Sequence, residues 1–135
     1  MDRETVCRAV SEIAGEESYS RRIYDILSRS APDESEKLML REYSEECSIS
    51  AGELYRTLRR MTGRNSEAED EEIKESGSYR TVIRGQALRE AALSRKCSSL
   101  ASRIPSDCRI RRLFKCHSDS AHLRATGLCL ILFQK

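Results

Sequence analysis

The sequence lacks tryptophan, has only two prolines and six glycines among its 135 residues, and is 5% aromatic. This composition is unlike that of β-sandwiches and barrels, which need frequent turns, and unlike that of collagen. Apolar runs are short: none approaches the roughly 20 residues that cross a bilayer, and residues 1–4 contain no apolar signal region. We therefore predict a soluble, cytoplasmic, helical protein with no membrane association.

The sequence also lacks the common motifs of metal knuckles and enzymes. No two of its six cysteines form a C-x-x-C pair, which excludes zinc ribbons, rubredoxin-like knuckles and thioredoxin motifs. Phosphate loops, dinucleotide fingerprints and Gly-x-Ser-x-Gly elbows are absent, and two histidines leave little scope for a hydrolytic triad. Most enzyme classes are thus disfavoured, and the cysteines are expected to be reduced and mostly buried.

Small and apolar residues recur at steps of three and four, the spacing of one helix face. In the first segment this stripe consists of Val6, Val10, Ile13, Glu17, Ser20, Tyr24 and Leu27. In the last segment it consists of Ile110, Leu113, His117, Ser120, Leu128 and Ile131. The pattern predicts helices over about 4–30, over about 29 residues ending at Thr62, over about 79–103 and over about 107–133, with Asp33 and Glu36 capping the second.

This order predicts an all-α, four-helix bundle in a single domain, residues 1–135. The first hairpin covers about 4–62, the linker 63–78 and the second hairpin about 79–133. A shift of 73 residues superposes Glu17 on Glu90 and Pro32 on Pro105, which favours two duplicated hairpins. Within the linker, the acidic stretch 67–75 is expected either to form a short helix or to be mobile.

Charge is distributed unevenly along the chain. Residues 78–135 carry 12 basic and three acidic side chains, whereas residues 66–77 carry one basic and six acidic. A basic half suits nucleic acid or another anionic partner, but no aromatic residues interleave with the charges as a stacking surface requires. We therefore expect a solvated helix face, with nucleic-acid binding as a less favoured interpretation.

The C-terminal run 128–133 is apolar on every side of a helix, although one bundle stripe needs only about half of those positions. Something else must cover the remaining side chains. Contact with a second copy of the chain, or burial under the acidic crossover, would do so. We predict a homodimer through this run.

Two glutamates, Glu17 and Glu90, fall on the apolar stripes of their helices. A carboxylate in such a position loses hydration and must be hydrogen-bonded, protonated, paired or bound to a metal. A dinuclear metal site in a helical bundle is built from one Glu on each of two helices and a Glu-x-x-His pair on each of the other two. The alternative is a hydrogen-bonded or end-exposed glutamate.

Several stretches together resemble a known superfamily. They are Gly15-Glu16-Glu17 with Tyr24 seven residues later, Ala31-Pro32-Asp33, residues 44–54, Glu90, residues 100–105, and residues 119–122. On these stretches the chain resembles the ferritin-like superfamily and, within it, the rubrerythrin-type domains. The resemblance implies a ferritin-like four-helix bundle with iron or manganese bound by carboxylates and imidazole.

The ligand positions depart from the pattern of the superfamily. Where the second-helix Glu and His are expected, the first half has Cys47 and Ser50, and the second half has Ser120 and Leu123. A register displaced by one residue, which turns a side chain by roughly 100°, instead offers Glu46 and the pair Asp119 and His122. In that register the resemblance implies five metal ligands, Glu17, Glu46, Glu90, Asp119 and His122. Glu17 and Glu90 are expected to bridge the metal, and Glu46 and Asp119 to complete the neutralisation of its charge. His122 is expected to anchor one ion.

The resemblance implies a rubrerythrin-like metal-binding redox protein of the iron or peroxide response, with a reduced or altered carboxylate site. Without a rubredoxin-like cysteine knuckle, such a protein needs an external electron donor. The alternative is a metal-free ferritin-like bundle that acts as a structural or protein-interaction module. The missing histidine of the first half favours this alternative.

Overall fold

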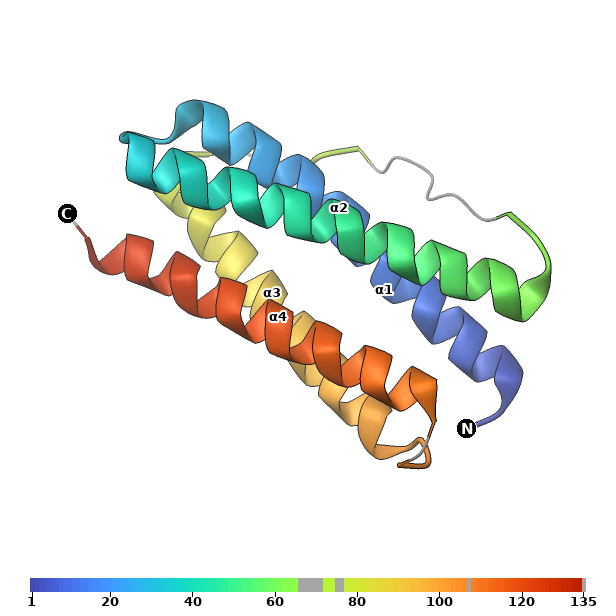
Figure 1. Cartoon of the computed structure of the whole chain (residues 1–135). Coiled ribbons are helices and arrows are strands. Elements are labelled where there is room, and N and C mark those ends of the chain that lie inside the picture. The colour runs from blue at the N-terminus through green and yellow to red at the C-terminus, as the bar shows by residue number, and fades with distance from the viewer. Residues whose placement is uncertain (66–71, 75–76, 107, 135) are drawn as a thin grey trace. The chain divides into compact units, whose positions relative to one another are not determined.

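The computed structural model describes residues 1–65, 72–74, 77–106 and 108–134. Within them the chain forms four helices, α1 (Arg3–Ser30), α2 (Glu34–Thr62), α3 (Tyr79–Ser102) and α4 (Arg109–Phe133). The chain divides into two compact units, Met1–Ser76 and Gly77–Lys135. Each contains one antiparallel helical hairpin, α1 with α2 and α3 with α4 (Figure 1).

The predicted all-α architecture of two long hairpins joined by a longer linker is confirmed. The helix bounds agree with the prediction to within one or two residues. The last helix begins at Arg109 instead of at about residue 107, which lies outside the described residues. The acidic stretch 67–75 also falls mainly outside them, so its two predicted forms remain predictions.

Local side chains define where three of the helices begin. The carboxylates of Asp2 and Asp33 accept hydrogen bonds of 2.8 Å from the backbone N–H groups three residues later, at the starts of α1 and α2. The hydroxyl of Ser78 accepts a 3.2 Å bond from the backbone N–H of Thr81 at the start of α3. Such caps satisfy N–H groups that have no partner inside the helix. α2 ends at Gly63, whose φ of 71° suits glycine.

The first hairpin combines an apolar core with polar contacts between its helices. Ser44 of α2 donates a 2.6 Å hydrogen bond to Oδ1 of Asp25 on α1. Nearby, the rings of Tyr24 and Tyr43 meet edge to face with centroids 5.4 Å apart, a favourable geometry for aromatic pairs. These contacts join the C-terminal part of α1 to the first half of α2.

In the second hairpin, two serines fix the spacing of α3 and α4. The hydroxyl of Ser94 donates to the carbonyl of Ser118, and the hydroxyl of Ser118 donates to the carbonyl of Ser94, each at 2.9 Å. Towards the open end, Arg80 donates a 2.7 Å bond to the carbonyl of Leu132. The residue pairs 94/118 and 80/132 show that the helices run antiparallel in constant register.

The cysteines are all free, as expected, but most are not buried. Cys47 and Cys97 are buried, Cys7 and Cys108 are half-buried, and Cys116 and Cys129 are exposed. The expectation that most thiols are buried was therefore wrong, because Cys116 and Cys129 lie on the outer face of α4. Across the described ranges, no helix is long and apolar enough to cross a membrane.

Candidate functional site

The two glutamates that the sequence places on apolar stripes are both completely buried. Glu17 on α1 and Glu90 on α3 each have a solvent exposure of 0%. Burying an ionised carboxylate without a compensating charge or hydrogen bonds costs several kcal/mol or shifts its protonation. Each of the two positions therefore requires local compensation.

For Glu90 the compensation comes from Arg124 of α4, within the same hairpin. Nε of Arg124 donates to Oε2 of Glu90, and Nη2 donates to Oε1 at 3.2 Å. Arg124 is itself 1% exposed, so the pair is fully withdrawn from solvent. The planar guanidinium binds both carboxylate oxygens at once, the strongest arrangement for such a pair.

The apolar stripe predicted for α4 does not include Arg124, because that stripe has a different phase from the inner face of the helix. Ser120, expected to face inward, is only half-buried. The buried residues in this part of the helix are His117, Ala121, Arg124, Ala125 and Leu128. His117, Ala121, Arg124 and Leu128 follow one another at steps of four, three and four, the spacing of one helix face. This spacing identifies the inner face once an arginine is accepted as a buried residue.

The other predicted ligands lie on outer faces of their helices. Glu46 on α2 is exposed, and so are Asp119 and His122 on α4. Within either unit, the described residues place no group of three or more His, Cys, Asp and Glu side chains where it could hold a metal ion. The assignment of Glu17, Glu46, Glu90, Asp119 and His122 as metal ligands stays a prediction.

His117 is buried on the inner face of α4, while its neighbour Cys116 is exposed. The two side chains thus diverge, as expected for adjacent helical residues. Among the described residues, two buried side-chain atoms, Oε2 of Glu17 and Nε2 of His117, form no hydrogen bond, although both residues make other interactions. The inner faces of both hairpins therefore contain polar side chains.

The pair of Arg124 and Glu90 limits the chemistry available at that point of the interior. A guanidinium is protonated at all accessible pH values and donates without accepting. Arg124 therefore places a permanent positive charge against both oxygens of Glu90. No protein-family model matches the chain, and no curated protein matches it in sequence.

Proposed function

We propose that the protein is a ferritin-like helical protein with a buried ion pair in place of a dinuclear metal site, and that it acts as a structural or protein-interaction module. The single observation that carries the proposal is the two-point contact of Arg124 with Glu90. In a dinuclear carboxylate site, metal ions offset the charge of the buried carboxylates. In this chain a guanidinium offsets the charge of Glu90 and binds both of its oxygens.

The outward positions of the remaining candidates support the same proposal. A carboxylate or imidazole can join Glu90 at a buried centre only from an inner face. Glu46, Asp119 and His122 are exposed, and each helical residue turns its side chain by roughly 100° from the last. The donor set present therefore does not fit the dinuclear iron or manganese site that the superfamily implies.

The outer face of α4 supports an interaction role. Leu123, Leu130 and Phe133 are 68%, 58% and 84% exposed. Leu123 and Leu130 are seven residues apart, the repeat that keeps side chains on one seam of paired helices. We propose this seam as the contact of a homodimer.

The competing proposal is an iron- or manganese-binding redox protein with an external electron donor. The complete burial of Glu17 and Glu90 is the observation that favours it. This proposal requires Glu90 to exchange its arginine for a metal ion. It also requires nitrogen or oxygen donors that the outer faces of α2 and α4 do not bring inward.

Metal content tests the two proposals directly. The full chain is purified without chelators, incubated with Fe(II) or Mn(II), desalted and measured by elemental analysis. We expect far less than one ion per chain, and the same value for the Glu17→Gln/Glu90→Gln variant. Glu42→Gln/Glu45→Gln, which removes two exposed carboxylates of α2, is the matched control for charge.

Stoichiometric iron or manganese in the wild-type protein would contradict the metal-free proposal if it were lost in the Glu17→Gln/Glu90→Gln variant and kept in the control. Circular dichroism of all three proteins verifies that they retain their helices. A loss of metal that accompanies unfolding is then distinguishable from a loss of ligands.

A further inference from the structure

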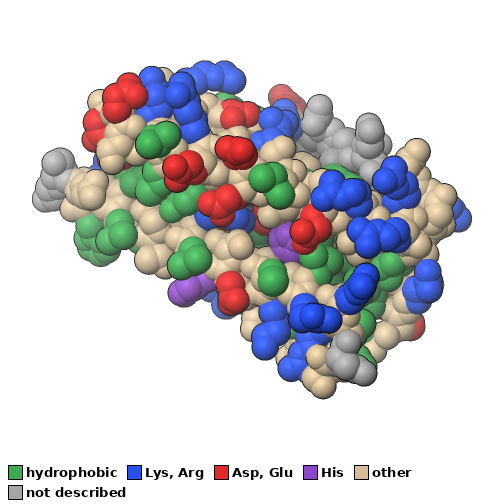
Figure 2. Space-filling model, in the orientation of Figure 1, with side chains coloured by type: hydrophobic (Ala, Val, Ile, Leu, Met, Phe, Trp, Pro, Cys, Tyr) green, Lys and Arg blue, Asp and Glu red, His purple; other side chains and the backbone are tan. Residues whose placement is uncertain are grey.

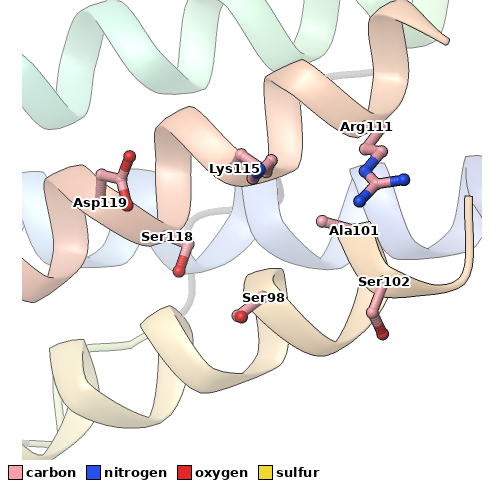
Figure 3. Close-up of a pocket in the computed structure, with 7 residues that line it drawn as sticks. All are labelled: Ser98, Ala101, Ser102, Arg111, Lys115, Ser118 and Asp119. Carbon is pink, nitrogen blue, oxygen red and sulfur yellow. The ribbon is translucent and has the colours of Figure 1, made fainter. Parts of the chain in front are cut away.

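The second hairpin contains a solvent-open cavity of about 230 Å³ between the C-terminal part of α3 and the N-terminal half of α4 (Figure 3). The polar side chains around it are Ser98 and Ser102 from α3, and Arg111, Lys115, Ser118 and Asp119 from α4. This volume is far larger than a single water molecule needs. The lining residues that the structure describes all belong to one hairpin, so the cavity is described within this unit.

Two cations on consecutive turns of α4 line the cavity. Arg111 is half-buried, and its Nη1 donates a 3.3 Å hydrogen bond to the carbonyl of Ile104, which holds the guanidinium in place. Lys115 follows four residues later, on the same side of the helix. Lys115 makes no hydrogen bond or ion pair with any described residue. Its ammonium and the remaining N–H groups of Arg111 are therefore available to an anion.

Hydroxyl groups from the two helices complete the lining. Ser98 lies on α3 opposite Ser118 on α4 (Figure 3), and its hydroxyl makes no hydrogen bond within the described part of the chain. The mutual bonds of Ser94 and Ser118 keep the two helices at a fixed spacing beside it. Donors thus surround the cavity on both sides before any ligand enters.

Among the described residues that line the cavity, Asp119 is the one with a negative charge. The surrounding sequence outweighs it, because residues 78–135 carry 12 basic and three acidic side chains. Exposed basic residues continue along α4 at Arg109 and Arg112, and Lys and Arg side chains gather around the turn between α3 and α4 in Figure 2. Such a field attracts anions towards the cavity.

We propose that this cavity binds the phosphoryl group of a small phosphorylated molecule. A phosphoryl group has three terminal oxygens and about two negative charges near neutral pH, which match a guanidinium, an ammonium and a hydroxyl arranged around one space. A nucleic-acid strand fits less well, since none of the described lining residues is an aromatic that could stack on a base. The proposal concerns an outer surface and does not depend on whether the interior binds metal.

Titration of the isotope-labelled full chain, followed by amide NMR at constant ionic strength, tests the assignment. The probes are glycerol phosphate, inorganic phosphate and a double-stranded DNA oligonucleotide. We expect saturable shifts at the α3–α4 turn with glycerol phosphate and weaker binding of inorganic phosphate. Arg111→Gln/Lys115→Gln is expected to weaken glycerol phosphate binding by about tenfold or more, the effect of losing charge-assisted hydrogen bonds.

Two further variants separate the cavity from general attraction to a basic helix. Arg109→Gln/Arg112→Gln removes the same charge from the same helix outside the cavity, and we expect it to change the affinity less than threefold. Lys115→Gln alone leaves the hydrogen bond from Arg111 to Ile104 intact. It therefore tests the cavity even if the double variant misfolds, and we expect it to weaken binding. Asp119→Asn removes the repelling carboxylate, and we expect it to tighten binding.

Three results would overturn the proposal. The first is an equal loss of affinity in the two double variants, which indicates diffuse electrostatic attraction. The second is saturable binding of inorganic phosphate with none of glycerol phosphate, which assigns the cavity to the free ion. The third is binding of the oligonucleotide with no shift from glycerol phosphate, which assigns the basic face to nucleic acid.

Discussion

Individual buried charges of this protein depend on their partners. When one member of a buried ion pair is removed, the other is left without hydration and without a counter-charge. Arg124 and Glu90 form such a pair, and each is at most 1% exposed. By contrast, the ion pair of Arg8 with Glu4 lies on the surface, where water screens it and its contribution is small.

The buried pair yields the first prediction. Arg124→Met should lower the free energy of unfolding by about 3–5 kcal/mol, because the Glu90 carboxylate stays buried without a counter-charge. Urea denaturation monitored by circular dichroism measures the change. Arg112→Met on the exposed side of α4 is the matched control and should change the free energy by less than about 0.5 kcal/mol.

A second substitution separates the cost of an unpaired charge from the cost of lost packing. Glu90→Met/Arg124→Met removes both charges and should recover much of the stability that Arg124→Met alone loses. If Arg124→Met lowered the free energy of unfolding by less than about 1 kcal/mol, the pair would not provide the compensation that Glu90 needs.

The six thiols give a second prediction at the same scale. Cys116 and Cys129 are exposed, while Cys47 and Cys97 are 0% exposed. Brief alkylation of the native protein should modify Cys116 and Cys129 first, and Cys47 and Cys97 only after denaturation, because the reagent must reach the sulfur. Peptide mass spectrometry quantifies each site. Early modification of Cys47 would show that the interior of the first hairpin is open.

Among the helices, the start of α1 depends on one titratable cap. The side chain and then the backbone N–H of Thr5 form hydrogen bonds that lower the pKa of the Asp2 carboxyl from its ordinary value of 3.8. A lowered pKa in the folded state means that the cap stabilises the helix above pH 3.8 and is lost as the pH falls through the lowered pKa.

An acid titration followed at the Thr5 amide by NMR tests this prediction. The midpoint of the shift should lie below 3.8, and the first turn of α1 should lose order below that midpoint. In Asp2→Asn the amide shift should no longer follow this titration, since the asparagine side chain caps without ionising. A midpoint at or above 3.8 would mean that the carboxylate is not held by these bonds.

The helices also show how far the sequence predicted the structure. All seven stripe residues predicted for α1, from Val6 to Leu27, are buried, because regular spacing of small and apolar residues determines an inner face. On α4 the pattern is interrupted by charged residues, and the assumed phase placed Ser120 inward instead of Ala121 and Arg124. A pattern based on hydrophobicity treats arginine as a surface residue, so it could not indicate a residue buried by pairing.

Across the whole chain, the two hairpins match in sequence position but differ in their charges. The shift of 73 residues that aligns Glu17 with Glu90 also aligns Ala51 of α2 with Arg124 of α4, and both of these residues are buried. At the position where the second hairpin has Arg124, the partner of Glu90, the first hairpin has an alanine, Ala51. The spacing predicted that both glutamates face inward, whereas the partner of Glu90 depends on a residue that the first half does not share.

The apolar seam of α4 gives the last prediction, that the chain is a homodimer. Within the run 128–133, Leu128 and Ile131 are buried, and Leu130 and Phe133 are large apolar side chains exposed to a partner, together with Leu123. Antiparallel pairing of two α4 helices sets Leu123 of each copy opposite Leu130 of the other and extends the seam over roughly 20 Å. Light scattering coupled to size exclusion should give twice the chain mass for the wild-type protein and for the control Leu88→Glu, which replaces another exposed leucine, on α3. The variant Leu130→Glu/Phe133→Glu should give the mass of one chain, because it places charges in the seam. A wild-type protein that is monomeric at micromolar concentration would rule out this contact.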